Sequence, residues 1–268
     1  MTRVLTLTFA AVLGLLPLPA EAHRAWLLPS TTVLSGEDPW ITVDAAVSND
    51  LFVFEHRPLG LDDLTLTGPD GQPVAAENKA TGRFRSTFDL PLAQPGTYRL
   101  AVVSSGYFAR YELDGARKRW RGAKEEIATA IPASATNVAI SRFDNRVETF
   151  VTVGPPTKEA LAPVGAGLEM VAVTHPNDLY AGETARFRFL LDGGPVEGLE
   201  VEVVQGDGRY RSEAGDRVLR TDADGMVEIA WPEAGRYWIG TDIRSDDKDA
   251  DGATRRAGYT ATVEVLPQ

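Results

Sequence analysis

Residues 95–100 read PGTYRL, and residues 234–239 read AGRYWI. In each stretch a glycine turn leads into a strand that carries an aromatic side chain. A second pair of similar turns precedes an early strand in each half, with LSGE at 34–37 and LYAGE at 179–183. Short strands between glycine and proline turns are typical of β-sandwiches, and the repetition indicates two related units. The sequence predicts an all-β protein of two immunoglobulin-like β-sandwich domains in tandem.

Further strand-like segments lie on both sides of these motifs. They are residues 40–47, 63–67, 83–90, 95–103 and 146–153 in the first half, and 168–173, 184–191, 199–204, 226–231, 236–242 and 259–265 in the second. The series is broken at Gly154-Pro155-Pro156, and a stretch rich in glycine follows. We therefore expect an N-terminal β-sandwich domain at 23–156, a linker at 157–167 and a C-terminal immunoglobulin-like domain at 168–268.

The first 22 residues have the pattern of a signal peptide. A short basic start precedes an apolar stretch from Val4 to about Leu18, and Ala20-Glu21-Ala22 is an A-x-A cleavage site. No later segment approaches the roughly 20 apolar residues that span a bilayer. We expect residues 1–22 to be removed and the mature protein to begin at His23, in the periplasm, without membrane insertion.

The composition excludes several functional classes. The formal net charge is −11, which argues against binding to nucleic acid or to anionic membranes. The chain has no cysteine, so disulfides, thiolate metal sites and cysteine nucleophiles are absent. Patterns for a nucleophile elbow, a phosphate-binding loop or a dinucleotide fold are missing, and three histidines offer little material for a hydrolase triad. We expect a protein that is not an enzyme.

One segment interrupts the strand pattern. Residues Lys118–Ala130 are expected to form a short helix inserted in the first domain. Basic side chains concentrate around it at Arg110, Arg117, Lys118, Arg119, Arg121 and Lys124. They form either a solvated, ion-paired surface or a docking patch for an anionic ligand or partner.

His23 is the strongest candidate for chemistry. Cleavage would free an α-amino group, whose ordinary pKa is roughly 7.7–8.0, so this nitrogen can be neutral near pH 7. The amine and the Nδ1 atom of His23 can close one chelate ring on a metal ion, and a second histidine would complete a three-nitrogen brace. Such ligands suit copper, nickel, cobalt or zinc. The alternative is that His23 merely follows the cleavage site.

Only His56 and His175 can supply another imidazole. His56 ends an apolar cluster with polar groups at both ends, and is either the edge of a site or an exposed loop residue. His175 lies at the start of the second half, where a turn role competes with ligation. We favour His56 as the partner of His23, because both belong to the first predicted domain. Residues 247–252 match the first half of a calcium loop, but Gly258 stands where the loop needs glutamate, so the full motif fails. We favour a flexible acidic hairpin loop over a weak calcium site.

Three stretches resemble one family of exported bacterial proteins: AHRAWLLPS at 22–30, WITVDAAVSNDLFVFEHRPL at 40–59 and VTHPNDLYAGE at 173–183. The family is a domain of unknown function, described as the periplasmic component of nickel/cobalt uptake systems. The resemblance covers essentially the whole mature chain, and members begin with a histidine followed closely by tryptophan, as in His23 and Trp26. It implies a periplasmic, metal-related protein with immunoglobulin-like domains.

The expected function is therefore metal binding. The mature chain would hold nickel, cobalt or copper through His23, and would support uptake or handling together with a membrane transporter or an outer-membrane receptor. Two alternatives stay open at this point. One is a structural or interaction module accessory to an outer-membrane receptor, in which no metal binds. The other is a copper oxidase built on the histidine brace.

Overall fold

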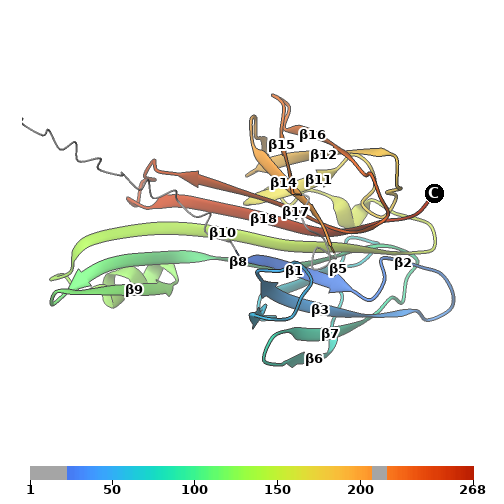
Figure 1. Cartoon of the computed structure of the whole chain (residues 1–268). Helices are drawn as coiled ribbons and strands as arrows, with labels where there is room; N and C mark the ends of the chain where they lie inside the picture. Colours follow the sequence, from blue (N-terminus) through green and yellow to red (C-terminus); the bar gives the residue numbers. More distant parts are fainter. Residues whose placement is uncertain (1–22, 207–215) are drawn as a thin grey trace, which may run out of the picture.

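The computed structural model describes residues 23–206 and 216–268 (Figure 1). The predicted signal peptide at 1–22 lies outside the described residues. Within them the fold is β throughout, except for the short helical segments η1 (Lys124–Glu126), α1 (Ile127–Ala130) and η2 (Glu159–Leu161). The all-β prediction is confirmed, and η1 and α1 lie inside the segment expected to be helical. No helix of the described part is long and apolar enough to cross a membrane.

The first layer is a five-stranded antiparallel sheet from the N-terminal half. Its order is β1 (Arg24–Pro29), β3 (Trp40–Ser48), β7 (Ser86–Pro91) and β6 (Glu77–Thr81), with β4 (Arg57–Pro58) also paired to β3. β3 and β7 alternate buried and less buried positions over much of their length, as expected for strands that turn one face to a core.

The middle layer is one nine-stranded sheet that both halves build. Its order is β15 (Arg217–Arg220), β14 (Glu200–Gln205), β17 (Gly235–Ser245), β18 (Thr254–Val265), β10 (Thr136–Val153), β8 (Gly96–Leu113) and β5 (Leu64–Thr67), with β2 (Val33–Leu34) beside β10 and β9 (Ala116–Gly122) beside β8. β10 and β18 are parallel and pair from Ser141 with Thr254 to Thr149 with Thr262. The two halves are therefore joined by backbone pairing.

The third layer is a four-stranded sheet from the C-terminal half. It contains β11 (Leu168–Ala172), β12 (Thr184–Leu191), β13 (Gly194–Pro195) and β16 (Met226–Ala230), with β12 at its centre. This sheet covers β14, β17 and β18, and their apolar side chains meet in one core around Phe187, Tyr259 and Trp231.

The two sandwiches lie on opposite faces of the middle sheet. In β10, Val147 and Val151 pack in the core shared with the five-stranded sheet, whereas Phe150 packs in the core shared with the four-stranded sheet. Neighbouring residues of a strand point to opposite faces. Each face of β10 thus belongs to a different sandwich, and this placement explains why the strand is buried from Val147 to Val153.

The two motifs that indicated the repeat are two copies of one hydrogen-bonded turn. The Tyr98 hydroxyl donates to the Gln94 carbonyl at 2.8 Å, and the Tyr237 hydroxyl donates to the Glu233 carbonyl at 2.8 Å. A tyrosine that bonds back to the backbone a few residues upstream is a tyrosine corner, which is a hallmark of immunoglobulin-like sandwiches. The repeat seen in the sequence is therefore structural.

A third apolar cluster, which we call the joint core, connects the outer face of the five-stranded sheet to β14 and β17. Its buried members are Trp26, Leu28, Ala46, Leu51, Val204 and Trp238. Trp238 Nε1 donates to the Ala25 carbonyl at 2.9 Å, and Thr260 Oγ1 donates to the same carbonyl at 3.2 Å. β1 thereby links the N-terminal half to the C-terminal half.

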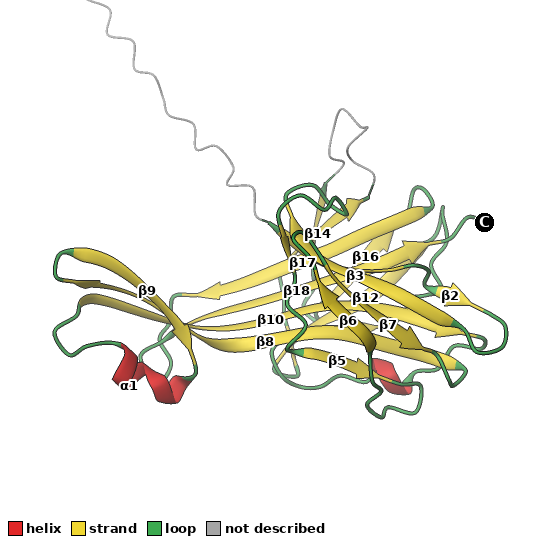
Figure 2. Cartoon of the chain, turned by 90° about the horizontal axis from the view of Figure 1, so that it is seen from below, coloured by secondary structure: helices red, strands yellow, loops and turns green. Residues whose placement is uncertain are grey.

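One part of the molecule projects beyond the sandwiches. β8 and β10 each run for 18 residues, and β9 pairs with the distal part of β8. Figures 1 and 2 show these three strands extending away from the stacked sheets as a long arm, with α1 beside it. We define the arm as residues 104–142. Residues 118–122, expected to be helical, are β-strand because they pair with β8.

Candidate functional site

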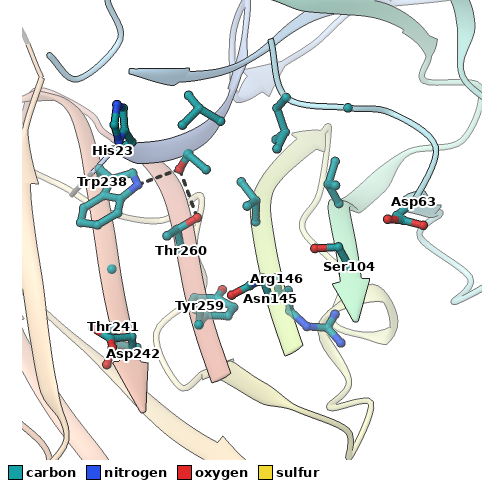
Figure 3. Close-up of a pocket in the computed structure, with 18 of the residues that line it drawn as sticks. His23, Asp63, Ser104, Asn145, Arg146, Trp238, Thr241, Asp242, Tyr259 and Thr260 are labelled. Carbon is teal, nitrogen blue, oxygen red and sulfur yellow. Dashed lines mark hydrogen bonds between the residues drawn. The ribbon is translucent and has the colours of Figure 1, made fainter. Parts of the chain in front are cut away.

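A groove of about 860 Å³ crosses the face of the middle sheet beside the joint core. Its floor is formed by β8, β10, β18 and β17, with His23 at one end (Figure 3). Ser104, Gly240 and Gly258 are among the floor residues, and such small side chains leave the surface hollow. A Cβ atom at Gly240 would lie 1.9 Å from Trp238 Cη2, so the indole ring rests against this glycine.

His23 and His56 lie side by side at this end of the molecule. Their ring centroids are 4.0 Å apart, with an angle of 31° between the ring planes. The placement follows from the sheet. β1 and β4 both pair with the end of β3, where Arg24 is opposite Ser48 and Arg57 is opposite Val47. The residues that precede β1 and β4 are thus brought together, and both histidines are exposed.

Arg24 fixes the backbone next to His23. Its guanidinium contacts Glu202 at 2.5 Å and Asp216 at 2.8 Å, and lies 5.5 Å from the centre of the Trp238 ring. Glu202 and Trp238 belong to the C-terminal half, so the backbone next to His23 is held by charges and an aromatic ring from the other sandwich.

His175 lies elsewhere and has a different environment. Its Nε2 atom is 2.9 Å from Thr97 Oγ1, and its Nδ1 atom accepts the Asn177 N–H at 3.2 Å. Thr97 pairs with Thr152 of β10. Thr260, which bonds to Ala25 near His23, pairs with Val147 of β10. The five residues from Val147 to Thr152 span about 17 Å of strand. The structure does not bring His175 to the two other histidines.

The chemistry at His175 is that of a structural residue. Burial lowers its pKa, because charging a ring removed from water is costly. In the described chain, no group of three or more histidine, aspartate or glutamate side chains is placed to hold a metal ion. The α-amino group that the predicted cleavage would release is one source of a third nitrogen beside His23 and His56.

The segment at 247–252, which matches half of a calcium loop, lies in the acidic loop between β17 and β18. The Asp249 carboxylate accepts the N–H groups of Asp251 and Ala253 at 2.9 and 3.0 Å, and Asp251 forms an ion pair with Lys124 at 2.6 Å. These carboxylates thus close the turn and contact η1.

Sequence reasoning missed Arg24 and Trp238 as residues of this region. A signal was present in the two similar motifs, where Arg99 follows the first tyrosine and Trp238 follows the second. The second motif has tryptophan where the first has arginine. This difference indicates that Trp238 has apolar neighbours, which here form the joint core.

Comparison with known proteins places the chain in a family. The model of a domain of unknown function, DUF4198, matches residues 20–245. The chain belongs to the DUF4198 family. No curated protein matches this DUF4198 chain.

Solved structures similar to the DUF4198 chain have low identity. The D0-D1 domain of intimin is 15% identical, with 90% of this chain and 97% of that chain covered and a TM-score of 0.24. A DUF4785 family protein from Legionella pneumophila is 11% identical, with 80% and 50% covered and a TM-score of 0.25. Native alpha-2-macroglobulin from Escherichia coli, spanning domains MG0-NIE-MG1, is 10% identical, with 86% and 96% covered and a TM-score of 0.20.

Proposed function

We propose that this DUF4198 protein is exported to the periplasm, is cleaved before His23, and binds a divalent transition metal ion there without catalysing a reaction. The ion would be nickel, cobalt or copper. The protein would support metal uptake or handling and pass its ion to a membrane transporter or an outer-membrane receptor.

The observation that carries the proposal is the pairing of two of the three histidines. His23 and His56 are 33 positions apart in the sequence, yet their ring centroids are 4.0 Å apart. A pair of exposed imidazoles offers borderline nitrogen ligands of the kind that nickel, cobalt and copper accept. The predicted cleavage site would add the α-amino nitrogen of His23 to this pair.

The residues fit such an ion in chemistry. In the structure the two rings face each other, so a shared ion requires rotation of at least one side chain. The exposure of both rings permits this rotation. Arg24, held by Glu202 and Asp216, keeps the adjacent backbone in place and so limits the ordering that binding costs.

The test is calorimetric titration of nickel, cobalt and copper into processed protein whose first residue has been verified by mass spectrometry. His56→Ala and a form with methionine before His23 each remove one proposed ligand. Both should bind at least about tenfold more weakly, because a lost ligand leaves fewer bonds to the ion.

A His175→Gln protein is the control, because His175 lies away from the pair and should leave metal affinity unchanged. Circular dichroism verifies that each variant is folded. Equal affinity of the wild type, the extended form and His56→Ala for all three ions would refute the proposal.

A further inference from the structure

The arm carries four arginine side chains on one face. Arg110 is directly opposite Arg119 in the register of β8 and β9, and Arg117 and Arg121 occupy alternate positions of β9. Alternate residues of a strand, and residues paired across two strands, point to the same side of a sheet. All four side chains are exposed. We call this surface the arginine face.

The opposite face of the arm is covered in part, although Lys118 on it is exposed. Ala109, which precedes Arg110 in β8, is completely buried, and its partner in β9 is Trp120. Figure 2 shows α1 beside the arm strands. The arginine face is therefore the more open side of the arm.

The charges on this face have no ion-pair partner in the part of the chain that the structure describes. The ten ion pairs found among the described residues include none of these four arginines. Glu112 is opposite Arg117, but its carboxylate accepts the Asn137 side-chain amide at 2.9 Å. Like charges directly opposite one another, as at Arg110 and Arg119, destabilise a sheet. An anionic partner would remove this repulsion.

Two of the guanidinium groups are stacked on aromatic rings of the same face. The Arg121 guanidinium lies 4.1 Å from the centre of the Phe143 ring, and that of Arg110 lies 5.5 Å from the centre of the Phe108 ring. A planar guanidinium that stacks on a ring keeps its N–H groups free at the edge, and these bind phosphate oxygens in a fork. The arginine face can therefore bind oxyanions through these N–H groups.

The arm also separates this charge from an acidic body. Residues 104–142 contain seven of the 27 Lys and Arg residues but only four of the 38 Asp and Glu residues. The distal ten residues of β8 extend roughly 34 Å at the usual rise per residue. Electrostatic repulsion is screened over about 8 Å at physiological salt, so distant carboxylates of the body do not cancel attraction at the arm. The acidic loop between β17 and β18 is the exception, because its Asp251 contacts Lys124 of the arm.

We propose that the arginine face docks the protein onto the phosphate headgroups of an anionic phospholipid bilayer. The four charges lie side by side on two exposed strands, β8 and β9, which suits a plane of phosphates better than one enclosed anion. The inference revises the expectation from net charge alone, because local charge at the arm differs in sign from the total.

The test is co-sedimentation of the full mature protein, free of metal, with vesicles. One set contains phosphatidylglycerol and phosphatidylcholine, and the other contains phosphatidylcholine only. The wild type should bind the first set, lose binding as salt increases and ignore the second set. Each arginine near an anionic leaflet raises the partition constant by about fivefold, so Arg110→Gln with Arg119→Gln should lower it by about 25-fold.

The matched control is Lys79→Gln with Arg83→Gln, which removes the same charge from exposed positions of the body and should bind as the wild type does. His56→Ala should also bind vesicles normally, which keeps this test separate from metal binding. Equal binding of the wild type to both vesicle sets, or of the arginine double variant and the wild type to the first set, would overturn the proposal. So would a lipid-free dimer in sedimentation velocity that the double variant loses, because a second copy would then occupy the face.

Discussion

The Tyr98 hydroxyl stabilises the turn before β8, and the Tyr237 hydroxyl stabilises the turn before β17. Tyr98 both donates to the Gln94 carbonyl and accepts the Gln94 N–H at 2.9 Å. Tyr98→Phe and Tyr237→Phe should each lower the free energy of unfolding by about 1 kcal/mol, the usual net value of a hydrogen bond. Urea unfolding measures this. Tyr111→Phe, on the arm, is the control, and equal losses in all three variants would contradict the role of the corners.

At the same scale, His175 makes part of the fold sensitive to pH. Its Nδ1 atom can accept the Asn177 N–H only while it carries no proton. Burial lowers the pKa of His175, the carboxylate of Asp178 opposes that effect and the ammonium of Lys158 reinforces it. An unfolded histidine titrates at about 6.5.

Protonation of His175 should destabilise the folded protein. Below about pH 6.5 the unfolded chain takes up a proton at His175 that the folded chain resists, so the free energy of unfolding falls as pH falls towards the lowered folded pKa. Urea midpoints at pH 7.5 and 5.5 should therefore differ more in the wild type than in His175→Gln. The same difference in both proteins would mean that His175 does not contribute.

At the scale of the element, β17 depends on one glycine. Gly240 leaves room for the Trp238 ring, which is part of the joint core and donates to the Ala25 carbonyl. Gly240→Ala should displace the ring and lower the free energy of unfolding by about 1–3 kcal/mol, the usual effect of overpacking. Urea unfolding and the near-ultraviolet spectrum of tryptophan report it. Gly60→Ala, where a Cβ meets nothing within 4 Å, should be neutral.

Most strands that line a sandwich core were predictable from the sequence, whereas β1 and the arm strands were not. The expected strands at 40–47 and 184–191 agree with β3 and β12 within one residue. β1 was missed because Leu27 faces the first core while Trp26 and Leu28 face the joint core, so the strand shows no apolar alternation. The distal parts of β8 and β10 were missed because the arm has no sandwich core beneath it.

Part of the candidate site was likewise predictable from the sequence, and part was not. The proximity of His56 to His23 was expected because both lie in the first half, and the structure places them together, while their ligation of a metal stays a prediction. The groove was not foreseen, because its floor requires β10 to pair with β18 from the other half. No local pattern encodes a pairing between strands so far apart in the sequence.

At the scale of the whole molecule, the shared middle sheet predicts that the two halves unfold together. Parallel pairing of β10 with β18, the joint core and the contacts of Arg24 all cross between the halves. Differential scanning calorimetry should show one transition whose calorimetric and van't Hoff enthalpies agree. Two resolved transitions would show that each sandwich is stable without the other.

The same parallel pair determines the order in which the sheet can be completed during synthesis. β10 is complete at Val153, but its partner β18 begins only at Thr254, after 100 further residues. Until the last strand emerges, one edge of β10 is an open row of N–H and C=O groups, which can recruit a strand of another chain. A protein truncated before residue 254 would keep that edge permanently and should aggregate. The final strand thus acts as the closing step of the first sandwich as well as of the second.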